Sequence, residues 1–148
     1  MLRVLDLLRD MFGHVVIDTP PHLSEVVLQA VAESDLVGFI VAMDVPSVKN
    51  ARLGLQAFQL LQIPLAKVAL LLNRADSRVH LTPHDIEKVL ELKVDVAFPS
   101  DVVVPQSVNQ GVPVMLQYPR SQFAAQIDQF AQLVLGRAEE AGPGWTVR

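Results

Sequence analysis

The chain has 148 residues, of which 51% are apolar and 19% charged, with a net charge of −4 and no cysteine. This length and apolar content suit one domain with a sizeable core and exclude intrinsic disorder. The lack of cysteine excludes a disulfide scaffold, a zinc ribbon and a thiol nucleophile. The acidic balance gives no overall electrostatic footprint for nucleic acid, so we expect no direct nucleic-acid partner.

Apolar segments in this chain are too short to cross a membrane. The longest, Leu36–Met43, falls far below the roughly 20 residues that a spanning helix needs. The first residues, Met1–Asp10, carry several charges among their leucines and lack the apolar middle and cleavage site of a signal peptide. We therefore predict a cytoplasmic protein with no integral membrane segment.

Predicted strands and helices alternate along the chain. Short runs rich in valine, isoleucine and leucine are typical of strands buried on both faces of a parallel sheet. In chain order the sequence predicts a helix over Leu2–Arg9, a strand over His14–Asp18, a helix over Leu23–Glu33, a strand over Leu36–Met43, a helix over Ser47–Leu61, a strand over Lys67–Asn73, a helix over Ile86–Leu92 after a Thr82–Pro83 cap, a weaker strand over Val94–Phe98, a short helix over Val102–Gln110 closed by Gly111, and a helix over Ser121–Arg137. This order predicts an α/β fold with a mostly parallel sheet flanked by helices.

Polar residues follow each predicted strand. They are Asp18–Pro21, Asp44–Ser47, Asn73–Asp76 and Pro99–Asp101. In a parallel sheet these exits lie on one edge, where open α/β folds bind ligands. The alternative is that such residues only end strands and begin helices, and for Asp44 and Ser47 we favour that structural role.

The predicted strand that ends at Asp18 has the form of a Walker B strand, with an apolar run followed by a carboxylate. A carboxylate at a rigid strand tip can hold the hydration shell of Mg²⁺ beside a triphosphate, usually through water. The prolines that follow Thr19 stiffen the next turn. An apolar run followed by aspartate is common in proteins, so the prediction of a Walker B strand depends on the residues at the other strand exits.

Asn73 and Arg74 suit the recognition of a purine. An asparagine at a strand exit can hydrogen-bond the edge of a base, and an arginine beside it can lie over the ring. The stretch through Asp76 also resembles the Asn-Lys-x-Asp guanine motif of GTPases, with Arg74 in the lysine position. The alternative is a capping cluster ahead of the next helix.

At these residues the sequence resembles the MinD/ParA family of deviant Walker A ATPases, and most of all its CpaE/TadZ-like branch, which is linked to pilus assembly and septum-site or polar localisation. The resemblance extends over Leu2–Leu135. It rests on the segments Phe12–Pro21, Ala32–Asp35, Leu72–Asp76, Phe98–Asp101 and Val104–Val114. The last of these is the most specific, because composition alone does not explain it.

The resemblance implies a P-loop NTPase-like, three-layer fold and a set of site residues. Asp18 would be the Walker B residue that holds Mg²⁺ through water, and Thr19 would belong to switch II. Asn73 and Arg74 would contact the adenine of ATP. The loop Pro99, Ser100 and Asp101 would lie along the base and ribose. Family members form a homodimer around ATP, and a protein partner from a pilus, secretion or division machinery is implied.

One departure from the family is severe, because no Gly-Lys pair occurs anywhere in the chain. The phosphate loop, its lysine and its Mg²⁺-binding hydroxyl are therefore missing. We predict that residues 1–137 are the carboxyl-terminal part of a MinD/ParA-like nucleotide-binding domain without its first β-α-β segment, and that residues 138–148 are a flexible tail. The isolated chain is then inactive, and its sheet has an unpaired edge that favours dimerisation or strand exchange.

Two other functions remain open. A nucleotide-independent interaction module on the same fold would use the exposed sheet edge to bind a protein partner. A GTPase of the same superfamily is less favoured, because the Asp18 turn continues Thr-Pro-Pro rather than Asp-x-x-Gly.

Overall fold

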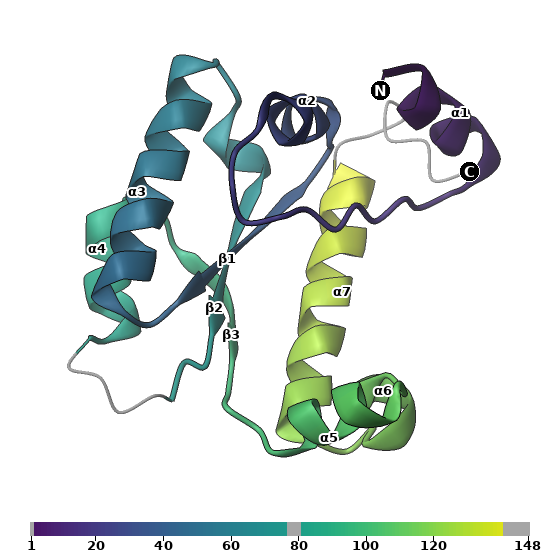
Figure 1. Ribbon diagram of the computed structural model, residues 1–148, viewed down its shortest axis with the longest axis vertical. Coiled ribbons are helices and arrows are strands. Elements are labelled where there is room, and N and C mark those ends of the chain that lie inside the picture. Colours follow the sequence, from purple (N-terminus) through teal and green to yellow (C-terminus); the bar gives the residue numbers. More distant parts are fainter. Residues whose placement is uncertain (1, 77–80, 141–148) are drawn as a thin grey trace.

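The computed structural model describes residues 2–76 and 81–140. Three strands, β1 (Val37–Ala42), β2 (Val68–Asn73) and β3 (Val94–Phe98), form a parallel sheet in the order β1-β2-β3. Figure 1 shows this sheet between two helical layers, with α3 and α4 on one face and α7 on the other. The predicted α/β fold with a parallel sheet flanked by helices is confirmed.

Every predicted helix is present, with ends displaced by a few residues. The helices are α1 (Leu2–Met11), α2 (Glu25–Glu33), α3 (Val45–Leu60), α4 (Pro83–Leu90), α5 (Val103–Gln110), α6 (Val114–Gln117) and α7 (Gln122–Glu140), with a 3-10 turn over Leu65–Lys67. Thr82 and Asp85 form a capping box at the start of α4, and Gly111 closes α5 in the left-handed conformation. The short α6 and the 3-10 turn were not predicted.

Two apolar layers account for the unbroken valine and leucine runs of the strands. On one face, Leu70 and Leu72 of β2 pack with residues of α2, α3 and α4, including Phe58. On the other face, Ala69 and Leu71 pack against Phe130 and Leu133 of α7. Because β2 is covered on both faces and paired on both edges, its side chains from Val68 to Leu72 are all buried.

The prediction of a paired strand at His14–Asp18 is wrong for this structure. Residues 14–18 form an irregular segment between α1 and α2, which Figure 1 shows passing in front of β1 and α7. Val16 is 95% exposed. Within residues 2–76 and 81–140 no strand pairs with this segment, and without such a ladder its β-branched residues do not make a strand.

The carboxyl-terminal boundary also differs from the predicted one. Helix α7 continues to Glu140, so the first three residues of the predicted flexible tail are helical. Residues 141–148 lie outside the described part of the chain. In the part that the structure describes, no helix is both long and apolar enough to pass through a bilayer.

Asp95 supplies a hydrogen-bond acceptor where the pairing between β2 and β3 is irregular. The register between these strands shifts at Leu70 and Leu71. The carboxylate of Asp95 accepts a hydrogen bond from the Leu70 N–H at 2.8 Å and pairs with Arg137 of α7 at 3.0 Å. The Leu70 N–H at the irregularity therefore has a partner, and Asp95 links β2 to α7.

We expect Leu70→Ala to lower the free energy of unfolding by about 2–5 kcal/mol, because it removes a fully buried side chain and leaves a cavity. Leu60→Ala is the matched control. Leu60 ends α3 and is 85% exposed, so its loss should change stability by less than about 0.5 kcal/mol. Urea unfolding of the two variants measures both values, and an equal effect would contradict the assigned core.

Candidate functional site

The three strands end at the same level, so the loops that follow them share one edge of the sheet. Asn73, the last residue of β2, is in register with Ala42 of β1 and with Phe98 of β3. Directly after β1, Asp44 caps α3, and its carboxylate accepts hydrogen bonds from the Ser47 N–H at 2.8 Å and the Ser47 hydroxyl at 2.9 Å. The preferred capping role of Asp44 is thereby confirmed.

The loops after β2 and β3 are joined by two hydrogen bonds. The Ala75 N–H donates to the Phe98 carbonyl at 2.9 Å. The Ser100 N–H donates to the carboxylate of Asp76 at 2.6 Å. Hydrogen bonding from Ser100, first of all from its backbone N–H, lowers the pKa of Asp76. The structure therefore brings Asn73–Asp76 and Pro99–Asp101 together as one paired loop.

Within this paired loop, three of the predicted site residues present exposed side chains. Asn73, Arg74 and Ser100 are exposed, whereas Pro99 and Asp101 are half-buried. Arg74 has a φ of 54°, a left-handed conformation that costs a non-glycine residue about 1–2 kcal/mol. The carboxylate of Asp101 accepts a hydrogen bond from the Val103 N–H at 3.0 Å and so helps to begin α5.

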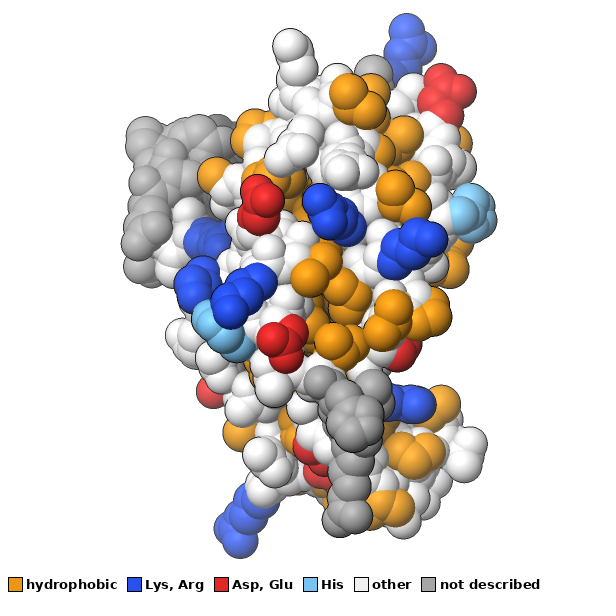
Figure 2. Space-filling view, turned by 90° about the vertical axis from the view of Figure 1, so that its left-hand side faces the viewer, with side chains coloured by type: hydrophobic (Ala, Val, Ile, Leu, Met, Phe, Trp, Pro, Cys, Tyr) orange, Lys and Arg blue, Asp and Glu red, His pale blue; other side chains and the backbone are white. Residues whose placement is uncertain are grey.

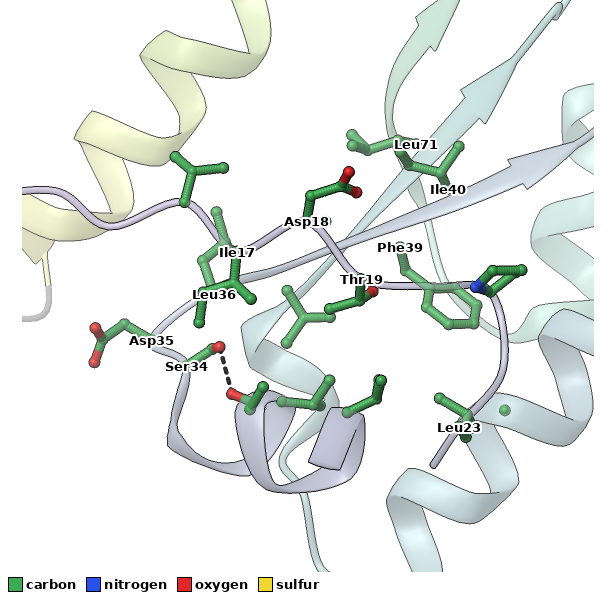
Figure 3. Close-up of a pocket in the computed structure, with 18 of the residues that line it drawn as sticks. Ile17, Asp18, Thr19, Leu23, Ser34, Asp35, Leu36, Phe39, Ile40 and Leu71 are labelled. Carbon is green, nitrogen blue, oxygen red and sulfur yellow. Dashed lines mark hydrogen bonds between the residues drawn. The ribbon is translucent and has the colours of Figure 1, made fainter. Parts of the chain in front are cut away.

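Asp18 and Thr19 lie elsewhere, on a large groove beside β1. The groove has a volume of about 1410 Å³ and is lined by the segment Val15–Pro21, by β1 and by parts of α2, α3 and α7. Figure 3 shows Asp18 and Thr19 among the side chains that line it, near Phe39 and Ile40. The groove extends past Ala42 to Ser47 at the start of α3.

The predicted residues therefore fall into two groups. Among the described residues that line the groove, none belongs to the paired loop after β2 and β3. Asp18 is exposed and is not held at the tip of a paired strand. The structure brings the expected base-contacting residues together but does not bring Asp18 into the same pocket.

A single carboxylate such as Asp18 can bind Mg²⁺ only together with water and with the phosphate oxygens of a ligand. Magnesium usually keeps several waters and takes one or two carboxylates together with phosphate oxygens of the substrate. In the ranges 2–76 and 81–140, no three His, Cys, Asp or Glu side chains gather in a way that could hold a metal. The donor set suits water-mediated Mg²⁺ that a bound nucleotide also ligates, and not a metal held by protein alone.

Solved structures with a similar arrangement identify the fold. A ParA family ATPase from Chlorobium tepidum superposes with a TM-score of 0.80 at 22% identity, covering 87% of this chain and 54% of the other. The MinD cell division protein of Aquifex aeolicus superposes with a TM-score of 0.79 at 16% identity, covering 90% of this chain and 58% of the other. The cell division ATPase MinD of Pyrococcus furiosus superposes with a TM-score of 0.73 at 19% identity, covering 90% of this chain and 56% of the other. The fold is that of the MinD/ParA ATPases.

The MinD/ParA fold is present here in part. The chain spans little more than half the length of each of these three proteins. The identities of 16–22% establish a shared fold and not shared site residues. No model of a known protein family matches the sequence, and no curated protein does either.

The exposed face over α3 and α4 carries both charged and apolar side chains. Figure 2 shows basic, acidic and apolar side chains there, with several basic side chains close together at the left of the view.

Sequence reasoning missed the organising role of Asp76. The residue was placed at a strand exit, but only the structure joins it to a backbone N–H on the next loop. A short polar side chain at the start of a loop is a signal for such a bond, because aspartate often accepts from nearby backbone N–H groups. The sequence does not tell which backbone group it reaches.

We expect the Ser100 amide resonance to titrate with the carboxyl group of Asp76. The folded pKa of Asp76 lies below its ordinary value, so the link is complete above that ordinary value and is lost as the pH falls through the lowered pKa. Asp76→Ala should abolish this titration and increase exchange of the Ser100 amide. Two-dimensional NMR across acidic pH measures both effects.

The capping box of α4 supplies a control for that titration. The carboxylate of Asp85 accepts from the Thr82 hydroxyl at 2.6 Å and from the Thr82 N–H at 2.9 Å, and these two bonds lower the pKa of Asp85 too. The Thr82 amide should titrate in the Asp76→Ala variant as it does in the wild type. A Ser100 amide that is indifferent to Asp76→Ala would contradict the paired loop.

Proposed function

We propose that this chain is the base-recognition part of an ATP-binding, dimerising ATPase of the MinD/ParA type. The observation that supports this most is the paired loop at the carboxyl edge of the sheet, where Asp76 holds Ser100. Ligands of open α/β folds bind outside the carboxyl ends of the strands. The fold and this loop together favour a nucleotide over other small ligands.

In this proposal, Asn73 and Arg74 contact adenine. An asparagine amide offers both a donor and an acceptor to the edge of a purine, and a planar guanidinium can stack on its ring. Both side chains are exposed at the end of β2 and free to meet a ligand from that side. The adjoining Pro99, Ser100 and Asp101 would lie along the base and ribose.

Asp18 and Thr19 would serve the phosphate side together with Mg²⁺. Their groove continues to the carboxyl end of β1, where a triphosphate extending from the base would pass. The groups that cradle phosphates are missing from these 148 residues, because the sequence has no Gly-Lys pair. Hydrolysis therefore requires a phosphate loop supplied by sequence outside them, and the isolated chain should not hydrolyse ATP.

The proposed partners are a second copy of the complete protein and a protein of a larger assembly. One similar structure is a MinC:MinD cell division protein complex from Aquifex aeolicus, of which this chain covers 57%. By analogy we propose a cytoplasmic protein of the CpaE/TadZ-like branch that positions a pilus, secretion or septum assembly and reaches the membrane through partners.

ATP is favoured over GTP by the role of Asp76. In the Asn-Lys-x-Asp pattern the last carboxylate would have to be available for guanine. Here the carboxylate of Asp76 is bonded to Ser100. A nucleotide-independent interaction module is the second candidate, since the large groove beside β1 is mostly apolar.

The reading frame upstream of Met1 separates these candidates at little effort. A Lys-Gly-Gly-x-Gly-Lys-Thr/Ser sequence within roughly 100 residues, the length of the missing β-α-β segment, supports the ATPase. A genuine start at Met1 supports the interaction module. Comparing ATP with GTP in a thermal-shift titration of the complete gene product then separates ATPase from GTPase.

We expect Asp18→Ala to lower ATP hydrolysis by the complete gene product about 10- to 100-fold, because it removes a group that orders the Mg²⁺ shell. Asp128→Ala, at an exposed position on α7, is the matched control and should leave the rate unchanged. Asn73→Ala should weaken ATP binding in the thermal-shift assay and leave protein stability unchanged. ATP hydrolysis by the isolated 148 residues that is lost on Asp18→Ala would refute the proposal that hydrolysis requires a phosphate loop from outside them.

A further inference from the structure

The surface that α5 and α6 form carries no charge. Residues 102–119 lie between Asp101 and Arg120 and contain no Asp, Glu, Lys, Arg or His, although 19% of the whole chain is charged. We call this segment the α5–α6 surface. The cores of protein–protein interfaces are depleted of charged residues in the same way.

Apolar side chains of the α5–α6 surface are open to solvent. Five of them are more than a third exposed, namely Val102, Val108, Val112, Met115 and Leu116. Single exposed apolar residues are ordinary, but several together without intervening charge mark an interaction site. On α3, by contrast, the exposed Leu53 stands beside the exposed Arg52.

Helix α5 gains little stability from burial within its own chain. It has eight residues and buries a single side chain, that of Ser107, whereas α3 buries five residues. A helix of this length is marginal in water unless one of its faces is packed. Val102 and Pro105 are both exposed and lie on the side of α5 opposite Ser107. That outer side is therefore the part of α5 available for packing against another molecule.

Hydrogen bonds fold α6 back onto α5, so that the two helices present one rigid body. The Val112 N–H donates to the Ser107 carbonyl at 3.2 Å, and the Ser107 hydroxyl donates to the Val112 carbonyl. The Tyr118 hydroxyl donates to the side-chain oxygen of Gln106 at 3.2 Å. Figure 1 shows the pair beneath the start of α7. Because the surface is already formed, docking onto it costs little ordering entropy.

We propose that the α5–α6 surface docks onto the same surface of a second copy of this chain, without nucleotide. Each copy has a net charge of −4, so two copies repel one another overall, whereas residues 102–119 bring no like charges together. In an isologous contact the same residues meet from both sides, and an uncharged apolar surface is complementary to itself. Glutamine amides carry both a donor and an acceptor, so they too can pair with their own copies.

The polar residues of the surface favour a second copy over a lipid bilayer. Helices that lie on membranes carry lysine and arginine on their polar face, and residues 102–119 have neither. The amides of Gln106, Asn109 and Gln110 are exposed, and lipid acyl chains offer them no hydrogen-bond partner. A second copy offers such partners.

This contact differs from the ATP-dependent pairing in the proposed function and does not rest on it. It is made by the side chains of α5 and α6 and needs no bound nucleotide. Asp101 of the paired loop begins α5, since its carboxylate accepts from the Val103 N–H at 3.0 Å. The contact would therefore keep two copies together between rounds of ATP binding, with the paired loop of each copy beside it.

Sedimentation velocity of the complete gene product, without nucleotide and Mg²⁺, tests the contact. We expect a monomer–dimer equilibrium that shifts with protein concentration. Leu116→Glu adds a carboxylate to both sides of the contact and should raise the dissociation constant at least about tenfold. Leu60→Glu on α3 is the matched control, since Leu60 and Leu116 are 85% and 75% exposed, and it should leave the equilibrium unchanged.

A second variant and a second measurement guard against misfolding. Val108→Glu, at a position 73% exposed on α5, should weaken the dimer as Leu116→Glu does. Both variants should keep the melting temperature of the wild-type monomer. In the unsubstituted protein, hydrogen exchange of peptides covering Val103–Gln117 should slow as the protein concentration rises, whereas exchange in α3 should not change.

The outcomes separate this contact from other occupants and from the proposed function. A dimer that both variants leave intact overturns the proposal, because the copies then meet elsewhere. A protein that stays monomeric at about 0.1 mM also overturns it. A monomer that floats with phosphatidylcholine vesicles identifies lipid as the occupant and overturns the second copy. Weakened dimers without ATP binding support the contact and reject the proposed function, whereas ATP binding with unweakened dimers rejects the contact alone.

Discussion

The backbone of β1 is the constraint on which the rest of this structure depends. A buried strand needs hydrogen-bond partners on both edges and apolar cover on both faces. β2 has both, and all its residues from Val68 to Leu72 are buried. Among the described residues β1 has a partner on one edge only, and its Ile40 is exposed. Segment 14–18, the groove and the partial cover by α7 all lie beside this edge of β1.

The same sheet places the candidate nucleotide site at some distance from that edge. The paired loop is held by β2 and β3, which pair with each other, and by the bond between Asp76 and Ser100. Asp18 depends on the segment beside the open groove. Under the proposed function, the base side of the site would rest on β2 and β3, whereas the phosphate side would depend on the segment beside the open groove.

Much of the fold could be predicted because local patterns and tertiary surroundings agree. The apolar runs of β2 and β3 have covered faces, and Thr82, Pro83 and Gly111 mark helix ends through chemistry that acts within a few residues. His14–Asp18 has an equally good strand pattern and fails, because pairing needs a neighbour that the segment's own residues do not supply. α6 is a single turn and has too few residues for a periodic signal.

The sequence by itself determined the class of fold, the order of its elements and the residues at each strand exit, since these depend on residue type and periodicity. It also determined that no Gly-Lys phosphate loop lies in these residues. Only the tertiary structure decided that Asp76 accepts from the Ser100 N–H, that Asp95 accepts from the Leu70 N–H, and that Asp18 lines a groove that Asn73 does not line. The reason is physical: each is a contact or separation between distant segments, and the packing of the sheet and helices sets it.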